Sequence, residues 1–210
     1  MKILIVAATR PEIALLTRHF NLPDGIFLKS KHFDVLITGV GMTATAFSLG
    51  KHLSNYYKLV LNLGIAGSFD RSIPLGTVVN ITTDIFSELG AENGDGFLSI
   101  DELGFGKNTY TASNNLLNNR VKDLKKCSGI TVNTVHGNED SIRKTILRLN
   151  PLTESMEGAA VLFCCESELV PCLQIRSISN YVEVRNKGNW NIGLAIENLN
   201  KWAIDFLTCT

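Results

Sequence analysis

The sequence feature that most constrains the fold is an uncharged segment followed by a mostly apolar one, over residues 155–180. Residues 158–165 contain no charged side chain, which predicts a buried helix with Ser155 as its cap. Residues 169–178 are mostly apolar, as expected for a central strand that is buried on both faces. A buried helix that leads into such a strand predicts an α/β fold with a largely parallel sheet.

Polar side chains cluster at the two ends of this helix and strand. Glu157 lies in the first turn of the predicted helix, and Arg176, Ser179 and Asn180 lie at the end of the strand. Because open α/β sheets bind ligands at the carboxyl ends of their strands, we expect these groups to face one crevice and to hold a polar small molecule. The alternative for Glu157 is structural, since an acid in a first helical turn interacts favourably with the helix dipole.

The rest of the chain alternates strands with helices and predicts one α/β domain over residues 1–210. The apolar pattern predicts strands at 2–8, 33–40, 58–63, 75–85 and 129–135, and helices at 11–20, 43–53, 114–125, 138–149 and 192–206. The segment 86–108 breaks this pattern, and its Phe and Leu content argues against disorder. We interpret that segment as a long loop that forms a pocket wall or a subunit contact.

Three of the predicted strands end in residues that suit a ligand site. Glu12 follows the first strand, where residues 7–12 contain no glycine, which argues against a dinucleotide-binding turn. Gly41 follows the second strand and lets a ligand approach the backbone. The motif Gly64-Ile65-Ala66-Gly67 predicts another glycine-bearing turn. The structural alternatives are a first-turn acid for Glu12 and simple tight turns for the glycines.

The composition argues against several classes of protein. The formal net charge is zero, with 20 basic and 20 acidic residues interspersed, so neither nucleic acid nor a membrane surface is an expected partner. The cysteines lack a CxxC spacing, the histidines lack HxxH or HExxH, and no GxSxG motif is present, which argues against disulfides, a metal site and a serine nucleophile. No apolar run approaches about 18 residues. We expect a cytoplasmic protein that binds a small neutral or weakly anionic molecule.

Three motifs resemble those of the nucleoside phosphorylase and nucleosidase superfamily. They are Gly64-Ile65-Ala66-Gly67, Ser155-Met156-Glu157-Gly158-Ala159 and Arg176-Ser177-Ile178-Ser179-Asn180. Glu12 resembles the early acid of the hydrolytic branch. Within that branch, residues 95–105 and Ser179-Asn180-Tyr181-Val182 resemble the futalosine hydrolase family, whose members release hypoxanthine from futalosine in menaquinone biosynthesis.

The resemblance implies a fold and a set of partners. The implied fold is a three-layer α/β/α sandwich around a mixed, mainly parallel sheet, without a cofactor. The implied ligand is a purine nucleoside, and the implied assembly is a homodimer or a higher homo-oligomer in the bacterial cytoplasm.

The resemblance also gives the candidate residues their roles. Glu12 becomes the general base and Asn180 the group that stabilises the departing base. Glu157 faces the ribose hydroxyls, and Met156 packs on the ribose. The remaining candidates for substrate binding are Gly41, Ile65, Ala66, Phe97, Phe105, Arg176 and Ser179, with Phe97 and Phe105 as apolar walls for the 5′ arm of the substrate.

Three other functions stay open at this stage. A methylthioadenosine or adenosylhomocysteine nucleosidase shares Glu12 and Glu157 but has Asp where this chain has Asn180. A phosphorylase needs a cationic phosphate site, for which Arg10 is the only nearby candidate. A nucleoside-binding protein keeps the pocket and lacks turnover.

Overall fold

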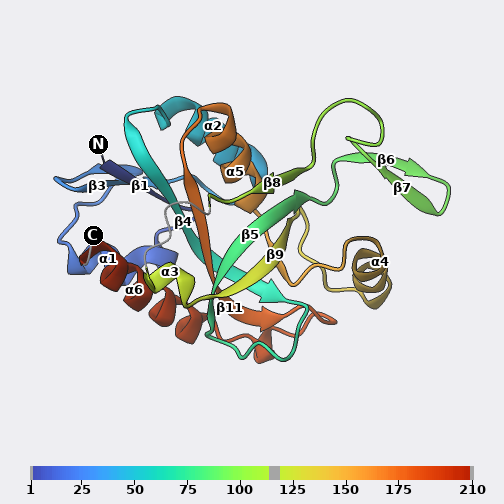
Figure 1. Cartoon of the computed structure of the whole chain (residues 1–210). Helices are drawn as coiled ribbons and strands as arrows, with labels where there is room; N and C mark the ends of the chain where they lie inside the picture. Colours follow the sequence, from blue (N-terminus) through green and yellow to red (C-terminus); the bar gives the residue numbers. More distant parts are fainter. Residues whose placement is uncertain (1, 114–118, 209–210) are drawn as a thin grey trace.

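In the computed structural model, which describes residues 2–113 and 119–208, the chain forms a three-layer α/β/α sandwich (Figure 1). The middle layer is a mixed, mainly parallel sheet, as predicted. Its strands in spatial order are β10 (Thr153–Ser155), β9 (Lys125–Thr131), β5 (Val78–Phe86), β11 (Cys172–Tyr181), β4 (Tyr57–Ser68), β1 (Lys2–Ala7), β3 (Phe33–Ile37) and β2 (Phe27–Lys29), with β8 (Thr109–Thr111) beside β5.

Alternate side chains of β1 enter two different cores, because successive residues of a strand point to opposite faces. Ile3 and Ile5 pack in the core that α1 (Ala14–His19) and α6 (Ile192–Thr208) cover. Leu4 and Val6 pack in the core beneath α2 (Met42–His52) and α5 (Gly158–Ser167). Figure 1 shows these helix pairs on opposite faces of the sheet. Within the described ranges, no helix is both long enough and apolar enough to span a membrane.

The short strand β10 closes one end of the sheet on itself. It pairs in parallel with β9 and also in antiparallel fashion with the last residues of β4. The strands β4, β11, β5, β9 and β10 therefore form a ring of neighbours. Glu154 of β10 lies opposite Gly67 of β4, and Asn180 of β11 is paired with the same glycine from the other side.

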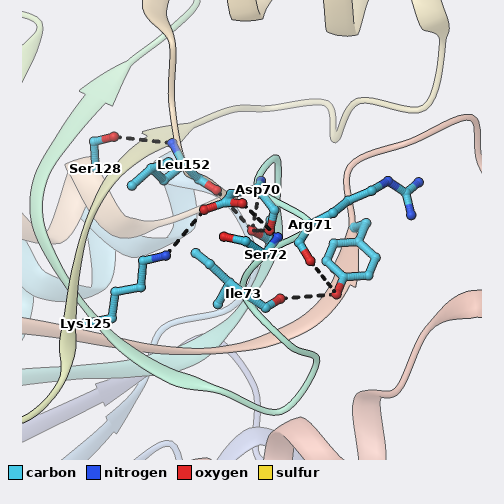
Figure 2. A network of polar contacts seen from close by, with 9 residues as sticks. Asp70, Arg71, Ser72, Ile73, Lys125, Ser128 and Leu152 are labelled. Atoms are coloured by element: carbon cyan, nitrogen blue, oxygen red, sulfur yellow. Dashed lines mark hydrogen bonds and ion pairs between the residues drawn. The ribbon is translucent and has the colours of Figure 1, made fainter.

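A network of polar contacts fastens the loop after β4 to this ring (Figure 2). Asp70 forms an ion pair with Lys125 at the start of β9, with 3.3 Å between the charged atoms. Leu152, just before β10, accepts a hydrogen bond from Ser68 and donates one to Ser128, both at 3.3 Å. These contacts join the end of β4 to β9 and to the residue that precedes β10. Together with the pairing of β10 to β4 and β9, they hold this three-residue strand in place.

The other elements lie around this body. They are the 3₁₀ turns η1 (Pro11–Ile13) and η2 (Lys187–Asn189), the helices α3 (Asn119–Lys122) and α4 (Glu139–Leu149), and a separate hairpin of β6 (Gly90–Asn93) and β7 (Gly96–Ser99). The hairpin projects away from the sheet (Figure 1). The helix predicted at 138–149 is confirmed as α4. The helix predicted at 114–125 lies partly outside the described residues.

Three predictions of secondary structure are wrong. Residues 64–67 are not a turn, because β10 and β11 both pair with this part of β4 and extend it to Ser68. The strand predicted at 129–135 is β9, which starts earlier with the exposed Lys125 and Lys126 and ends at Thr131. The segment 86–108 is not a featureless loop, since it contains the β6–β7 hairpin.

Candidate active site

Seven of the predicted site residues line one cavity of about 300 Å³ at the ends of β1, β4, β10 and β11. They are Glu12, Ile65, Ala66, Met156, Glu157, Ser179 and Asn180. Two further predicted residues do not line the cavity but lie next to residues that do. Gly41 contacts Glu157, and Arg176 lies near Glu12 beneath the cavity. The sheet thus brings together residues from both ends of the sequence, because parallel strands end at one edge.

Glu12 is held by three hydrogen-bond donors at the turn after β1. The main-chain N–H and the hydroxyl of Thr9 both donate to its Oε2, each across 2.9 Å. The N–H of Ile65 donates to Oε1 across 3.2 Å. A carboxylate with donors on both oxygens has a fixed orientation, and with three of about four lone-pair positions used it can accept one further donor.

Arg176 lies buried beneath the cavity, and only 1% of its surface is exposed. Its Nη2 donates to Oδ1 of Asn62 across 2.7 Å, whereas its Nε and Nη1 have no hydrogen-bond partner among the described residues. A Cβ at Gly64 would lie 2.9 Å from Nη1 of Arg176 and 3.0 Å from Oε1 of Glu12. Because Gly64 has no side chain, Nη1 of Arg176 and Oε1 of Glu12 can both lie close to its Cα.

Glu157 immediately precedes α5 and lines the cavity. Its Oε1 accepts a hydrogen bond from the N–H of Gly41 across 2.9 Å. Gly41 has a φ of 93°, in the left-handed region that favours glycine, and this conformation precedes α2. Burial raises the pKa of Glu157 above its ordinary value and the charge of Glu12 adds to this rise, while the charge of Arg176 and the bond from Gly41 oppose it.

The predicted cap of α5 is wrong. Ser155 belongs to β10, and the N-cap position of the helix is Glu157, whose side chain makes no capping bond. Pairing of β10 with β4 and β9 keeps Ser155 in the sheet, where its hydroxyl is buried without a partner among the described residues. The side chain of Glu157 is therefore directed at Gly41 and the cavity instead of at the helix end.

The amide of Asn180 lies close to Gly67, with 3.2 Å between its Nδ2 and the position that a Cβ would take. Its Oδ1 accepts a hydrogen bond from the hydroxyl of Ser179 across 2.8 Å, and its Nδ2 donates to the carbonyl oxygen of Tyr181 across 3.1 Å. Each end of the amide is thus anchored once. The second lone pair of the oxygen and the second N–H hydrogen stay available to a ligand.

Sequence reasoning missed a third acid in the cavity, Glu154. Only 5% of its surface is exposed, and it accepts a hydrogen bond from the N–H of His136 across 3.0 Å and contacts the imidazole Nδ1 of the same residue. His136 and Trp190 also line the cavity and were not predicted. The available signal was an acid in a short, otherwise uncharged stretch three residues before Glu157. Its partner is 18 residues away, which no local pattern reveals.

Phe97 and Phe105 lie apart from this cavity. Phe97 packs beneath the guanidinium of Arg148, 4.2 Å from ring centroid to charged carbon. Phe105 is 79% exposed and borders a second cavity of about 560 Å³ beside α2 and α5, which Met42 and Phe163 also line. Within one chain, neither ring lines the cavity that contains Glu12 and Glu157.

The described residues contain no group of three or more His, Cys, Asp or Glu side chains arranged to hold a metal ion. The cavity instead combines three carboxylates, those of Glu12, Glu154 and Glu157, with an anchored amide and with a buried arginine beneath them. Such a site can bind a polar ligand, remove a proton and stabilise developing positive charge.

Comparison with known proteins shows the family to which the chain belongs. The phosphorylase superfamily model matches residues 2–209. A futalosine hydrolase of Streptomyces coelicolor is 33% identical over 202 residues, which cover 91% of this chain and 80% of that protein. The chain belongs to the futalosine hydrolase family of this superfamily. It is therefore a nucleosidase, an enzyme that hydrolyses N-glycosidic bonds.

Solved structures confirm the fold. A mutant of the Helicobacter pylori futalosine hydrolase superposes with a TM-score of 0.86 at 19% identity, with 100% of both chains covered. A mutant of the H. pylori methylthioadenosine nucleosidase, with 5′-methylthioadenosine in its active site, gives 0.86 at 20% identity, with 100% of this chain and 99% of that chain covered. The nucleoside phosphorylase-like sandwich expected from the sequence is thus the observed architecture.

Proposed function

We propose that this nucleosidase hydrolyses the N-glycosidic bond of futalosine and releases hypoxanthine. The observation that carries the proposal is the approach of Glu12 and the unpaired Nη1 of Arg176 around Gly64, on the cavity that also contains Glu157 and Asn180. We further propose that this reaction belongs to menaquinone biosynthesis in the cytoplasm, as the resemblance of residues 95–105 to the family implies.

Glu12 acts as the general base in this proposal. Its carboxylate is oriented by Thr9 and Ile65, lines the cavity and retains one of about four lone-pair positions, on Oε1. A water molecule that donates to Glu12 and accepts from Nη1 of Arg176 would be positioned to attack C1′. N7 of the purine takes a proton from solvent, the water oxygen bonds to C1′ as the bond from C1′ to N9 breaks, and the water proton passes to Glu12. The purine leaves on the opposite side of the sugar with the electron pair of that bond, as the neutral base.

Glu157 recognises the ribose. An ionised carboxylate only accepts hydrogen bonds, and its two oxygens match the neighbouring 2′ and 3′ hydroxyls. The N–H of Gly41 holds one oxygen in place, and Met156 packs on the sugar face. The negative charge also stabilises the positive charge that develops on C1′ and O4′ in the transition state.

Asn180 favours a 6-oxopurine as the leaving base. Such a base departs readily when N7 is protonated, and it then presents N7–H as a donor beside the O6 acceptor. The amide of Asn180 offers the complementary pair, with one free lone pair on Oδ1 and one free hydrogen on Nδ2. A 6-amino base presents a donor at C6, so the same orientation does not fit it.

The mouth of the cavity supports a substrate with an anionic aromatic 5′ arm. Trp190 lines the cavity, and the guanidinium of Arg185 lies 5.3 Å from its ring centroid. Arg185 is exposed and forms no ion pair with another described residue. The benzoate of futalosine could stack on the indole and place its carboxylate at this guanidinium, whereas a methylthio group needs neither contact. A role for Phe105 in binding the arm, as expected from the sequence, would require a second chain of a homo-oligomer.

A phosphorylase activity has less support. Arg10 is bound to Asp24 and to the carbonyl oxygen of Gly25, and it borders a different cavity from the one that holds Asn180. An arginine that is already paired outside the cavity does not supply a phosphate site there.

The test is an assay of the purified protein with futalosine, inosine and 5′-methylthioadenosine, each with and without phosphate, followed by chromatography of the free base. We expect hypoxanthine from futalosine at a rate that phosphate does not change, and little adenine from 5′-methylthioadenosine. A preference for 5′-methylthioadenosine, or a strict requirement for phosphate, would refute the proposal.

A further inference from the structure

Glu154 and Asn180 flank one glycine from two neighbouring strands. Glu154 is the register partner of Gly67 in β10, and Asn180 is its partner in β11. Side chains of paired residues project from the same face of a sheet, and the Cα atoms of residues two strands apart are roughly 10 Å from each other. Both side chains line the same cavity. A flat ligand lying over Gly67 therefore has the amide on one side and the carboxylate on the other.

The carboxylate of Glu154 is buried but keeps the capacity to accept another hydrogen bond. One oxygen accepts from the N–H of His136 and the other contacts its Nδ1. The second ring nitrogen, Nε2, is 2.8 Å from the hydroxyl of Thr145, so the imidazole is fixed from both ends. Two carboxylate oxygens offer about four lone-pair positions, and His136 uses two of them.

We infer that Glu154 determines base specificity by accepting the N1–H hydrogen bond of a 6-oxopurine. This inference rests on the proposed function, in which Asn180 binds N7 and O6. In a purine, N7, the C6 substituent and N1 follow one another along one edge, so a base that uses Asn180 at N7 and O6 presents N1 toward the opposite side of Gly67. Hypoxanthine has a hydrogen on N1, and the carboxylate accepts it.

An adenine base meets the opposite situation at this position. Its N1 carries a lone pair and no hydrogen, so it faces a carboxylate that cannot donate. The N–H of His136 cannot substitute as the donor, since it is already bound to Glu154. Glu154 therefore rejects adenine at N1, independently of the rejection by Asn180 at N7 and C6.

The experiment measures the binding of free bases by calorimetry, so that it does not depend on turnover. The ligands are hypoxanthine, 1-methylhypoxanthine and adenine, and the proteins are the wild type and Glu154→Gln. A hydrogen bond to a charged acceptor corresponds to about 10- to 100-fold in affinity. We expect the wild type to bind hypoxanthine tighter than 1-methylhypoxanthine by that factor. We expect Glu154→Gln to lower the hypoxanthine-to-adenine ratio by at least about 10-fold, because its amide can donate to the N1 of adenine.

Thr145→Val is the matched control for a purely structural role of Glu154. This substitution removes the contact between the Thr145 hydroxyl and Nε2 of His136 and so loosens the imidazole, but it leaves the carboxylate of Glu154 in place. We expect the ratios of base affinity in this variant to equal those of the wild type. A shift in Thr145→Val as large as that in Glu154→Gln would show that Glu154 only anchors His136 and would overturn the inference.

The outcomes separate this inference from the proposed function. Equal affinity of the wild type for hypoxanthine and 1-methylhypoxanthine would overturn the role of Glu154, and this comparison requires no variant to fold. Efficient hydrolysis of futalosine together with that result would leave the proposed function intact. Absence of futalosine hydrolysis together with a large N1-methyl effect would refute the substrate and retain Glu154 as a base-recognition residue.

Discussion

The N–H of Gly41 donates a hydrogen bond to Oε1 of Glu157 across 2.9 Å, and this bond joins the start of α2 to the start of α5. The two residues are 116 positions apart in the sequence. The bond fixes one carboxylate oxygen, so the direction of the acid in the cavity depends on a backbone conformation that glycine favours.

Glu12→Gln should lose about 10²- to 10⁴-fold in kcat, which is the usual range for general-base assistance. The amide is nearly the same size but cannot take a proton from water. Substrate affinity should change little, since Glu12 does not bind the nucleoside in this mechanism. Steady-state kinetics with futalosine, combined with equilibrium binding of the nucleoside, measures both quantities. Near-normal turnover would exclude the role.

Glu157→Gln should make the enzyme less sensitive to the ribose hydroxyls. The wild type should lose far more kcat/KM on the 2′-deoxy nucleoside than the variant does, because the variant has already lost the charged acceptor. Two proteins and two nucleosides give four kcat/KM values. Together these values measure the interaction between the residue at position 157 and the 2′ hydroxyl. Equal sensitivity of the two proteins to the 2′-deoxy change would contradict a contact between Glu157 and the sugar.

Asn180→Asp should shift the ratio of kcat/KM from 6-oxo toward 6-amino nucleosides. An Asp can accept from the 6-amino group and, when protonated, donate to N7. A mismatch at a polar contact can change specificity by up to about 10⁴-fold in a well-built site. The assay compares futalosine with its 6-amino analogue in both proteins. An unchanged ratio with an intact fold would mean that Asn180 does not contact the base.

Arg185→Ala should weaken the binding of futalosine and leave inosine, which lacks the benzoate arm, almost unaffected. The expected loss for one charge-assisted contact is about 10-fold in KM. Lys187→Ala is a suitable control, because Lys187 is an exposed cation two positions away in η2. A similar loss for both variants would indicate general electrostatic attraction and not a specific contact.

Asp84→Asn should change how stability depends on pH. Burial raises the pKa of Asp84 to about 6, although hydrogen bonds from Gln174 and Thr131 oppose the rise. Because the folded-state pKa exceeds the ordinary value of 3.8, the contribution of Asp84 to the free energy of unfolding is full below that ordinary value. It declines as the pH rises through 6, by up to about 3 kcal/mol.

The variant should therefore gain stability relative to the wild type as the pH rises from about 4 to about 7. The amide introduced by Asp84→Asn would keep both contacts once the Gln174 amide turns over. Its oxygen can accept from Thr131, and its NH₂ group can donate to Oε1 of Gln174, which has no partner among the described residues. Urea unfolding of both proteins at several pH values measures the difference, with the exposed Asp101→Asn as the control. A difference that stays constant across this range would rule out titration of Asp84.

The sequence predicts the parts of the molecule whose pattern is local. Local sequence patterns reveal three of these parts. They are the uncharged run of α5, the apolar run of β11 and the position of Glu12 directly after β1. The layered fold also follows, because buried strands that alternate with helices have few arrangements.

The features that the sequence hides depend on contacts between distant segments. Residues 64–67 look like a turn because two glycines end an apolar run, yet β11 pairs with all four of them and they remain strand. Pairing of Ser155 with Thr131 of β9 removes this serine from the helix cap. Glu154 looks like an ordinary surface acid until its pairing with His136 and its place beside Gly67 are known.

The three-residue strand β10 runs directly into the loop that carries Glu157, so the two acids proposed to contact the base and the sugar are three positions apart on one short piece of chain. This short backbone segment thus fixes the spacing between the side chain at the purine edge and the side chain at the sugar hydroxyls in the proposed complex. Under the proposed roles, paired substitutions at positions 154 and 180 would admit another nucleobase without displacing the sugar contact. Diversification of substrate in this scaffold would then take two codons and no new pocket.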